Sequence, residues 1–270
     1  MLREKNMKKT DQEIILNIVL VCLNNFADFT LTVSSLKKLK YPHFKIIVID
    51  SSDDLKIRKF VETEKNFDIS YVWQEKDGVY SAMNLGIETS EPNSFVWFLN
   101  PGDVLVDSEV VIDMLKALDE SSGKWAFAQA RNAKPNENQI YPKKIDILGK
   151  KGIAKGNAKI SHQAIFVCRE TLIANGYFDT SYKIAADQAM LMKLVDAPSV
   201  FIPKVMVEID QNGISGKFPL QTIYETIKVN YLSGAWSLNT SVFTLLARLI
   251  QLSYGTLKLK LAYVIKSMRK

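Results

Sequence analysis

The stretch YVWQEKDGVYSAMNLGIETSEPNSFVWFLNPGDV, residues 71–104, decides the fold. It opens on a short β-branched and aromatic run at residues 70–73 and closes on the apolar run at residues 94–99, and both runs are typical of strands. Between them, residues 82–87 are helix formers that follow the flexible Asp77-Gly78. This order of strand, loop, helix and strand predicts a parallel α/β unit.

The second strand of this unit ends at the turn Asn100-Pro101-Gly102-Asp103. Asp103 is therefore placed where a buried parallel strand opens into a loop, which is where α/β sheets locate their ligand sites. Proline and glycine also fix ordinary β-turns, and a solvated aspartate in such a turn explains the same residues. On these residues alone both interpretations stay open.

The chain resembles family-2 glycosyltransferases of the GT-A fold in two motifs. GVYSAMNLGI at residues 78–87 matches the family pattern G-[IV]-Y-D-A-M-N-x-G-I, and FLNPGD at residues 98–103 matches F-L-N-x-G-D. Ser81 stands where the family usually has aspartate, and the acidic residues before Gly78 lie one position closer to it. Either Glu75 or Asp77 therefore fills the family's acidic position.

A second motif group follows in the order that the family has. HQAIF at residues 162–166, GYFD at 176–179 and AADQ at 185–188 match H-Q-[AS]-x-F, G-x-F-D and a-x-D-[YQ]. The resemblance implies that Asp187 is the catalytic base, since an acceptor hydroxyl needs a positioned carboxylate to take its proton. A carboxylate favoured by the helix dipole is the alternative for Asp187. The resemblance also names weaker candidates for the sugar or acceptor pocket: Trp97, His162 and Gln163.

The same resemblance implies a nucleotide pocket and a metal ligand. Its candidate nucleotide contacts are Leu23, Asn24, Asp50, Asp77 and Asn84. Asp103 would hold a divalent cation, Mn²⁺ or Mg²⁺, against the diphosphate of the donor, because hard cations prefer oxygen ligands. Asp50 has a second interpretation, as a cap of the helix that follows it.

The whole chain of 270 residues is long enough for the core of one α/β domain. Strands at 14–23 and 45–49 alternate with helices at 29–39 and 55–64, and this alternation continues to a last strand at 200–209. We therefore expect an α/β fold, a GT-A catalytic domain at residues 13–216 with a Rossmann-like, mostly parallel sheet. Residues 1–12 are a polar leader expected to be disordered, and residues 131–156 a long surface excursion.

Basic residues before the apolar run at 14–23 imitate a signal peptide, but Asp11 and Glu13 interrupt them and no small-x-small cleavage site follows. The only cysteines, Cys22 and Cys168, lie in apolar runs and predict buried, reduced thiols in a cytosolic protein. No apolar run approaches the ~20 residues that span a bilayer.

The net charge of +6 is concentrated in the tail. From residue 226 onward there are seven basic residues and no acidic one, so the rest of the chain is close to neutral and does not favour nucleic-acid binding. At about 100° per residue, the tail places most basic side chains opposite its apolar ones, with Lys260 as the exception. Basic amphipathic helices at 217–270 on an anionic membrane surface are predicted, with a helix packed on the core as the alternative. The protein would then be cytoplasmic and peripheral on the inner face of the cell membrane.

Taken together, the patterns favour an inverting, metal-dependent glycosyltransferase of the hexosyltransferase type. The donor would be a nucleotide-diphosphate sugar, with a UDP-sugar favoured, and the acceptor a hydroxyl of a saccharide or lipid-linked molecule in surface polysaccharide assembly. One alternative is a catalytically silent, membrane-associated partner of another transferase. A sugar-phosphate nucleotidyltransferase is less favoured, because the first turn, residues 24–28, has neither glycine nor a basic residue.

Overall fold

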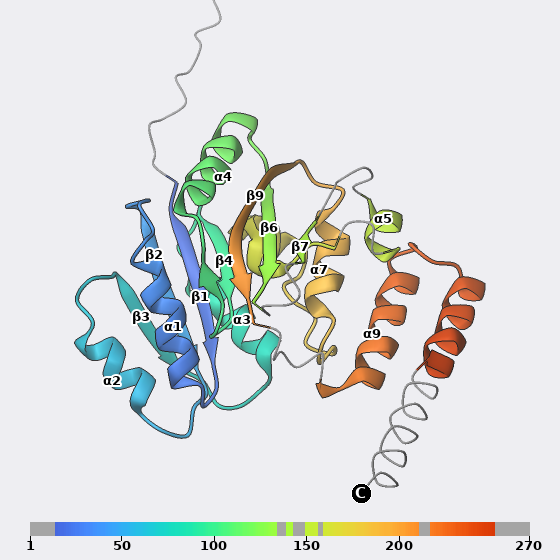
Figure 1. Ribbon diagram of the computed structural model, residues 1–270, viewed down its shortest axis with the longest axis horizontal. Helices are drawn as coiled ribbons and strands as arrows, with labels where there is room; N and C mark the ends of the chain where they lie inside the picture. Colours follow the sequence, from blue (N-terminus) through green and yellow to red (C-terminus); the bar gives the residue numbers. More distant parts are fainter. Residues whose placement is uncertain (1–13, 134–138, 143–148, 156–158, 211–216, 252–270) are drawn as a thin grey trace, which may run out of the picture.

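The structure is a computed structural model that describes residues 14–133, 139–142, 149–155, 159–210 and 217–251 (Figure 1). The predicted disordered leader at 1–12 lies outside these residues. A nine-stranded sheet runs through the centre of the molecule, and helices cover both of its faces.

The first half of the chain forms a parallel α/β unit, as the sequence predicts. Its strands are β1 (Leu16–Cys22), β2 (Phe44–Asp50), β3 (Ile69–Trp73) and β4 (Phe95–Leu99), connected by α1 (Phe26–Leu36), α2 (Lys56–Thr63) and α3 (Val79–Thr89). All three pairings among these strands are parallel. Helix α3 begins directly after Gly78, earlier than predicted, because the φ of +88° at Gly78 turns the chain into the helix.

The second half of the sheet is mixed. Its elements are β5 (Val104–Leu105), α4 (Ser108–Ser121), β6 (Trp125–Asn132), β7 (Ile140–Tyr141), α5 (Lys150–Ala154), β8 (Ile165–Cys168), α6 (Arg169–Ala174), α7 (Ala186–Leu194) and β9 (Ser199–Ile209). Strand β8 is antiparallel to both β4 and β6, whereas β9 is parallel to β6 and antiparallel to β5. The sheet order is β3-β2-β1-β4-β8-β6-β9-β5, with β7 beside β6. The mostly parallel arrangement therefore holds only for the first four strands.

Two hydrophobic cores lie on opposite faces of this sheet. Helices α1, α2 and α4 bury their apolar sides on one face, and α3, α6 and α7 cover the other. The central strands are buried on both faces, so they appear in the sequence as continuous apolar runs without alternation. Of the two cysteines, Cys22 is buried as predicted, while Cys168 at the end of β8 is half-buried.

The C-terminal residues that the structure describes, 217–251, are helical in two pieces. Helix α9 (Pro219–Leu232) ends near Gly234, whose φ is +73°, and a further helix covers residues 238–251. Helix α9 lies beside α7, and the helix at 238–251 lies on the other side of α9, at one side of the molecule (Figure 1). Among the described residues, none of the helices combines the length and the hydropathy that a membrane crossing requires.

Gly86 sets how closely α3 approaches the sheet. A Cβ atom at this position would lie 2.4 Å from Val19 Cγ1, which belongs to a β-branched side chain buried in the central strand β1. Because the χ1 angle of valine has few alternatives, the helix itself would have to move. The motif glycine is therefore explained by helix-sheet packing.

We predict that Gly86→Ala lowers the free energy of unfolding by about 1–3 kcal/mol through overpacking. This loss exceeds the ~1 kcal/mol that alanine contributes in a helix relative to glycine. Urea unfolding measures the change. Gly149→Ala is the matched control, since nothing lies within 4 Å of its added Cβ and its φ of 170° is open to any residue. Wild-type stability of Gly86→Ala would contradict this explanation.

Candidate functional site

The loops after β1 and β2 are joined to each other at the carboxyl edge of the sheet. Asn24 Nδ2 donates to Asp53 Oδ2 at 2.8 Å, and the Asp53 N–H donates back to Asn24 Oδ1 at 2.8 Å. The Asn24 N–H also donates to Ser52 Oγ at 2.8 Å. Asn24 has a φ of +55°, a conformation that asparagine tolerates better than most residues. The predicted nucleotide contact Asn24 is thus held rigidly between two loops.

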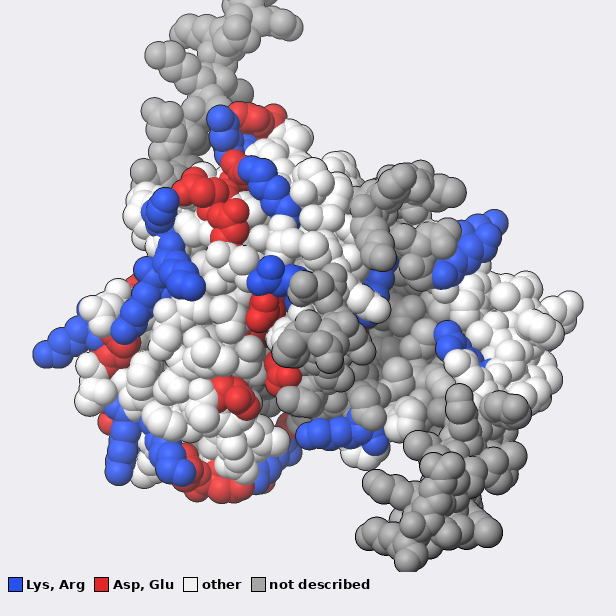
Figure 2. Space-filling model, in the orientation of Figure 1, with Lys and Arg blue, Asp and Glu red and all other residues white. Residues whose placement is uncertain are grey.

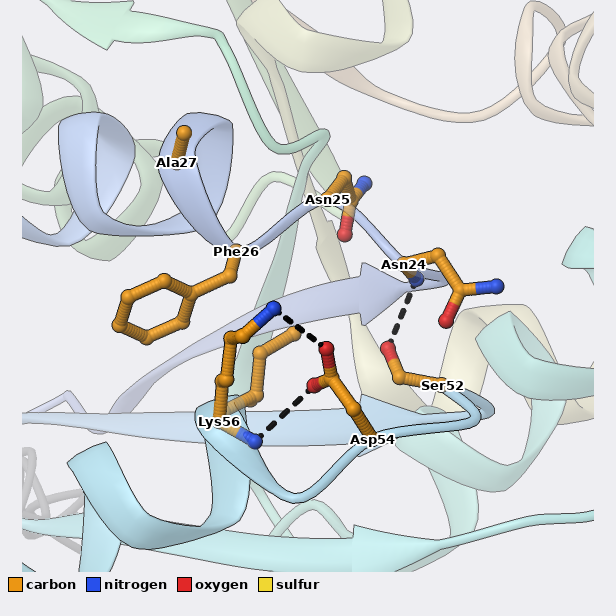
Figure 3. Close-up of a pocket in the computed structure, with 8 residues that line it drawn as sticks. Asn24, Asn25, Phe26, Ala27, Ser52, Asp54 and Lys56 are labelled. Atoms are coloured by element: carbon orange, nitrogen blue, oxygen red, sulfur yellow. Dashed lines mark hydrogen bonds and ion pairs between the residues drawn. The ribbon is translucent and has the colours of Figure 1, made fainter.

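A cavity of about 450 Å³ opens beside this junction (Figure 3). It is lined by residues 24–27 around the start of α1, by Ser52 and Asp54 of the loop before α2, and by Lys56 and Ile57 at the start of α2. The Lys76 side chain, from the loop after β3, reaches Asp53 at 2.5 Å. Its hydrogen bond, and a second one from Asn24, hold the pKa of Asp53 below the usual value. The loop after β3 is therefore tied to the junction of Asn24 and Asp53, beside the cavity rather than in its wall.

Asp50 lies at the end of β2 but does not face solvent. Its side chain is completely buried, and it accepts hydrogen bonds from the Ser52 N–H at 2.9 Å and the Tyr71 hydroxyl at 3.0 Å. Burial and this bond raise the pKa of Tyr71 to about 12. The bond from Ser52 closes a local turn directly after β2 and does not cap α2, whose N-cap residue is Leu55. The predicted nucleotide contact Leu23 is 51% exposed. A nucleotide contact at Asp50 stays a prediction and would require these bonds to change.

The other two predicted nucleotide contacts differ in exposure. Asp77 lies exposed in the loop before α3. Asn84 is half-buried on α3, where its amide donates to the Phe178 carbonyl and accepts from the Phe178 N–H, both at 2.9 Å. This reciprocal pair joins the first motif group to the second one. Both polar groups of the Asn84 side chain are used in it.

The turn after β4 is held by the buried carboxylate of Asp103, which is 1% exposed. Its Oδ2 accepts from the Asn100 N–H at 2.8 Å, and its Oδ1 accepts from the Asp210 N–H at 3.2 Å. The Gly102 N–H donates to Thr32 Oγ1 of α1 at 2.9 Å, and the φ of +102° at Gly102 favours glycine. Burial raises the pKa of Asp103 to about 7, although the two backbone bonds act in the opposite direction.

His162 and Asp187 meet at the same edge of the sheet. His162 Nδ1 lies 3.1 Å from Asp187 Oδ2, and His162 Nε2 lies 3.4 Å from Asn100 Nδ2. On the other carboxylate oxygen, Asp187 Oδ1 accepts from the Gln188 N–H at 2.8 Å and from the Tyr80 hydroxyl at 3.3 Å. The side chains of His162 and Asp187 remain 25% and 31% exposed. An oriented, accessible carboxylate therefore lies beside an imidazole.

The charges of this pair stabilise each other. Burial alone would raise the pKa of Asp187, but the hydrogen bond from His162 and the charge of His162 lower it. Burial disfavours the imidazolium form of His162, yet the hydrogen bond and negative charge of Asp187, with that of Asp103, raise the pKa of His162. Asp187 is therefore ionised at neutral pH, the state in which it can accept a proton.

A second cavity, of about 270 Å³, opens directly onto this pair. Its polar wall consists of His162, Asp187, Gln188 and Lys159, and its apolar wall of Ile153, Ile160, Ile165 and Leu191. The cavity combines a carboxylate, an imidazole and a cation with aliphatic surface. These groups can bind a molecule that carries both hydroxyl groups and apolar parts.

Neither Trp97 nor Gln163 lines the two cavities described above, and their place in the sugar or acceptor pocket stays a prediction. Trp97 is fully buried between β1 and β8, and its indole N–H donates to the Gln163 carbonyl at 2.7 Å. Gln163 is 7% exposed, and its side chain pairs with Ser161. Both residues belong to the packing that supports His162. The sequence could not reveal that these two residues are buried, because both lie next to motif positions whose side chains do reach the carboxyl edge of the sheet.

The residues near Asp103 do not form a prepared cation site in this arrangement. Among the described residues there is no cluster of three or more His, Cys, Asp or Glu side chains suited to a metal. Asp103 itself is buried, and backbone N–H groups occupy both of its oxygens. Its role as metal ligand stays a prediction that would require the turn to open.

Three residues at this edge were missed as candidates: Tyr80, Asn100 and Asp210. Tyr80 and Asn100 lie inside the quoted motifs, so their positions gave a signal, although nothing indicated contacts with residues far along the chain. Asp210 packs against the turn so closely that a Cβ atom at Gly102 would lie 3.3 Å from Asp210 Cβ. Its place directly after the last strand was the only available signal.

Comparison with known proteins gives a consistent result. The sequence model of glycosyl transferase family 2 matches residues 17–175. An uncharacterized glycosyltransferase of Mycobacterium tuberculosis (strain CDC 1551 / Oshkosh) is 30% identical over 210 residues, which cover 73% of this chain and 76% of that protein.

Solved structures with a similar fold include S. aureus TarS and a mannosyltransferase. S. aureus TarS in complex with UDP-GlcNAc has a TM-score of 0.68 at 15% identity, covering 87% of this chain and 72% of that one. The mannosyltransferase PcManGT of Pyrobaculum calidifontis, in complex with GDP-Man and Mn²⁺, has a TM-score of 0.61 at 15% identity, covering 89% and 79%. Against a longer TarS chain the match spans only 39% of that chain, at a TM-score of 0.64 and 18% identity. These similarities show a GT-A-like fold.

The buried Asp103 carboxyl makes stability depend on pH. Its pKa is about 7 in the folded chain, whereas in the unfolded chain it titrates near its ordinary value of 3.8. Between these values the folded state binds more protons, so we predict that this group lowers the free energy of unfolding as pH rises from about 4 to about 7. In Asp103→Asn this contribution disappears and the slope flattens. Urea unfolding across this range measures it, with the exposed Glu88→Gln as control. An unchanged slope in Asp103→Asn would refute the assignment.

Proposed function

Because the chain belongs to glycosyl transferase family 2, we propose that it is an inverting transferase that moves a sugar from a nucleotide-diphosphate sugar to an acceptor hydroxyl. The observation that carries this proposal is the contact of Asp187 with His162 at a cavity on the carboxyl edge of the sheet. A base for the acceptor must be ionised, oriented and accessible. Asp187 meets all three conditions.

In the proposed reaction the acceptor hydroxyl attacks the anomeric carbon from the face opposite the diphosphate. The new carbon-oxygen bond forms while the bond to the diphosphate oxygen breaks, and the hydroxyl proton passes to Asp187. His162 and the Gln188 N–H each hold one carboxylate oxygen, which fixes the direction of the base. The nucleoside diphosphate leaves with the bonding electron pair.

For the donor, we propose that the cavity between the loops after β1 and β2 receives the nucleotide. Its support is the junction of Asn24 and Asp53, which fixes the cavity wall, and the nearby cation Lys76. A UDP-sugar is the favoured donor, since TarS, which has a similar fold, is solved with UDP-GlcNAc. PcManGT is solved with GDP-Man and Mn²⁺, so the donor test includes guanine nucleotides and the cation.

For the acceptor, we propose a saccharide or lipid-linked molecule of surface polysaccharide assembly, reached from an anionic membrane surface on the cytoplasmic side. The helix at 238–251 supports this, because its exposed apolar side chains recur on one side of the helix: Leu238, Val242, Phe243, Leu246, Leu249 and Ile250. Figure 2 shows a mostly uncharged surface over the C-terminal helices. The tail has basic residues and no acidic one after Glu225. Such a surface suits anionic lipid headgroups.

We predict that Asp187→Asn lowers the turnover of sugar transfer about 10²- to 10⁴-fold, the range for loss of general base catalysis. Donor affinity should stay at the wild-type level, because Asp187 lies on the acceptor side of the reaction. Calorimetric titration with UDP-, GDP- and dTDP-sugars, with and without Mn²⁺, identifies the donor and the cation requirement. Transfer to an acceptor from the identified donor then gives the turnover.

The control is Glu88→Gln, which removes an exposed carboxylate on α3 that lines neither cavity and should leave turnover at the wild-type level. Wild-type turnover of Asp187→Asn would remove Asp187 from the role of base. Failure of the wild-type chain to bind or hydrolyse any sugar nucleotide, even with Mn²⁺, would favour the catalytically silent partner.

A membrane test follows from the apolar side of the helix at 238–251. Phe243 and Ile250 are 75% and 68% exposed, and burying one such side chain in lipid contributes about 1.5–3 kcal/mol. We therefore predict that Phe243→Glu/Ile250→Glu lowers binding to phosphatidylglycerol vesicles at least about tenfold. Cosedimentation measures it, with phosphatidylcholine vesicles as the uncharged comparison.

The matched control carries the same two charges on the other side of this helix, as Thr240→Glu/Gln251→Glu. Its net charge equals that of Phe243→Glu/Ile250→Glu, but its apolar side is intact. Only the change of net charge weakens its binding, so most of the vesicle binding should remain. Equal binding by both double variants would refute an apolar contact of this helix with the membrane.

A further inference from the structure

The loop that precedes Asp187 is held by a buried carboxylate from the C-terminal extension. Glu225 of α9 is 2% exposed. Its Oε1 accepts from the Lys183 N–H at 3.0 Å, and its Oε2 accepts from the Ile184 N–H at 2.8 Å and from the Ala185 N–H at 3.0 Å. Gln221, one turn earlier on α9, donates to Oε1 at 2.6 Å. One carboxylate therefore satisfies three consecutive backbone donors and one amide.

These bonds replace a local helix cap. Helix α7 begins at Ala186, and its N-cap residue Ala185 offers no side-chain hydrogen bond of its own. Burial would raise the pKa of Glu225, but the backbone N–H of Lys183, with the other donors, lowers it. The carboxylate is therefore charged, and charge-assisted hydrogen bonds to backbone N–H groups are among the stronger ones.

The same segment is also held from the opposite side. The Tyr80 hydroxyl donates to the Ile184 carbonyl as well as to Asp187. Helix α9 adds two further contacts: Asn230 Oδ1 accepts from Gln188 Nε2 at 3.0 Å, and Lys228 Nζ lies 4.7 Å from the centre of the Tyr182 ring. The backbone that carries Asp187 thus lies between α3 and α9.

We propose that Glu225 is a positioning residue for Asp187, so that α9 completes the active site from outside the region that matches the family model. The proposal rests on the proposed function, in which Asp187 is the base. A base misplaced by about 1 Å can lose a rate factor on the order of 100. Because Glu225 acts through the backbone at 183–185, its loss should affect turnover and leave donor binding intact.

Glu225→Gln tests the proposal with almost no change of volume. The amide keeps one acceptor oxygen but turns a donor toward backbone N–H groups, so at least one of them loses its partner. Turnover should fall about 10- to 100-fold while the dissociation constant of the donor changes less than about twofold. Amide hydrogen exchange at Lys183, Ile184 and Ala185 should become faster. Glu170→Gln is the matched control, because Glu170 also accepts a backbone N–H, from Asn93 at 2.8 Å, and thus holds a loop other than the one that precedes α7.

A double-mutant cycle separates positioning from a general loss of structure. If Glu225 acts through Asp187, then Glu225→Gln/Asp187→Asn should be no slower than Asp187→Asn alone. A further loss in the double variant, or wild-type turnover of Glu225→Gln, would overturn the proposal. If Glu225→Gln does not fold, Gln221→Met replaces it as the test, because it removes one donor to Glu225. Turnover of Gln221→Met should fall, but by less. Wild-type turnover of Gln221→Met would overturn the proposal.

Failure of the proposed function and failure of the positioning role give different results in Asp187→Asn and Glu225→Gln. Wild-type turnover of Asp187→Asn would refute the base and with it the catalytic consequence of Glu225. Loss of turnover in Asp187→Asn combined with unchanged turnover and unchanged exchange in Glu225→Gln would refute the positioning role alone.

Discussion

The buried carboxylate of Asp103 is the interaction on which the geometry of the site depends. By accepting the N–H groups of Asn100 and Asp210, it joins the turn after β4 to the end of β9, although these two strands do not pair. A polar group in the interior is tolerated only when such bonds are made, so the turn has little freedom to move. Asn100 is thereby held against His162, and His162 against Asp187. This anchor therefore supports one contact between the two motif groups, and the reciprocal pair of Asn84 and Phe178 supplies another.

Acidic residues at this edge fall into two classes that their positions in the chain do not distinguish. Asp50, Asp103 and Glu225 are at most 2% exposed, and each accepts backbone N–H groups. They shape loops. Asp187 accepts one backbone N–H too, but its second oxygen faces His162 and its side chain is 31% exposed. Of these four carboxylates, Asp187 alone combines orientation with access to a cavity, which is why the proposed chemistry centres on it.

The C-terminal helices connect this chemistry with the proposed membrane surface. The family model ends at residue 175, before the proposed base Asp187 and before α9. Helix α9 contacts the loop that precedes α7 through Glu225, and the exposed apolar side of the helix at 238–251 lies farther along the same extension. Helix α9 carries Glu225, which we propose positions Asp187, and the next helix along the chain would bring the acceptor near.

The amino-acid sequence by itself determined the parallel first half of the fold, because continuous apolar runs that alternate with amphipathic segments have one favourable arrangement. It also determined the motif positions that reach the edge and the charge asymmetry of the tail. Only the tertiary structure decided that Trp97 belongs to the core, that Asn84 holds Phe178, and that β8 runs antiparallel. Burial and hydrogen bonding of these groups depend on neighbours that are distant in the chain. The same holds for the bond from the Asp210 N–H to Asp103. Local sequence pattern carries no information on which distant residues come together.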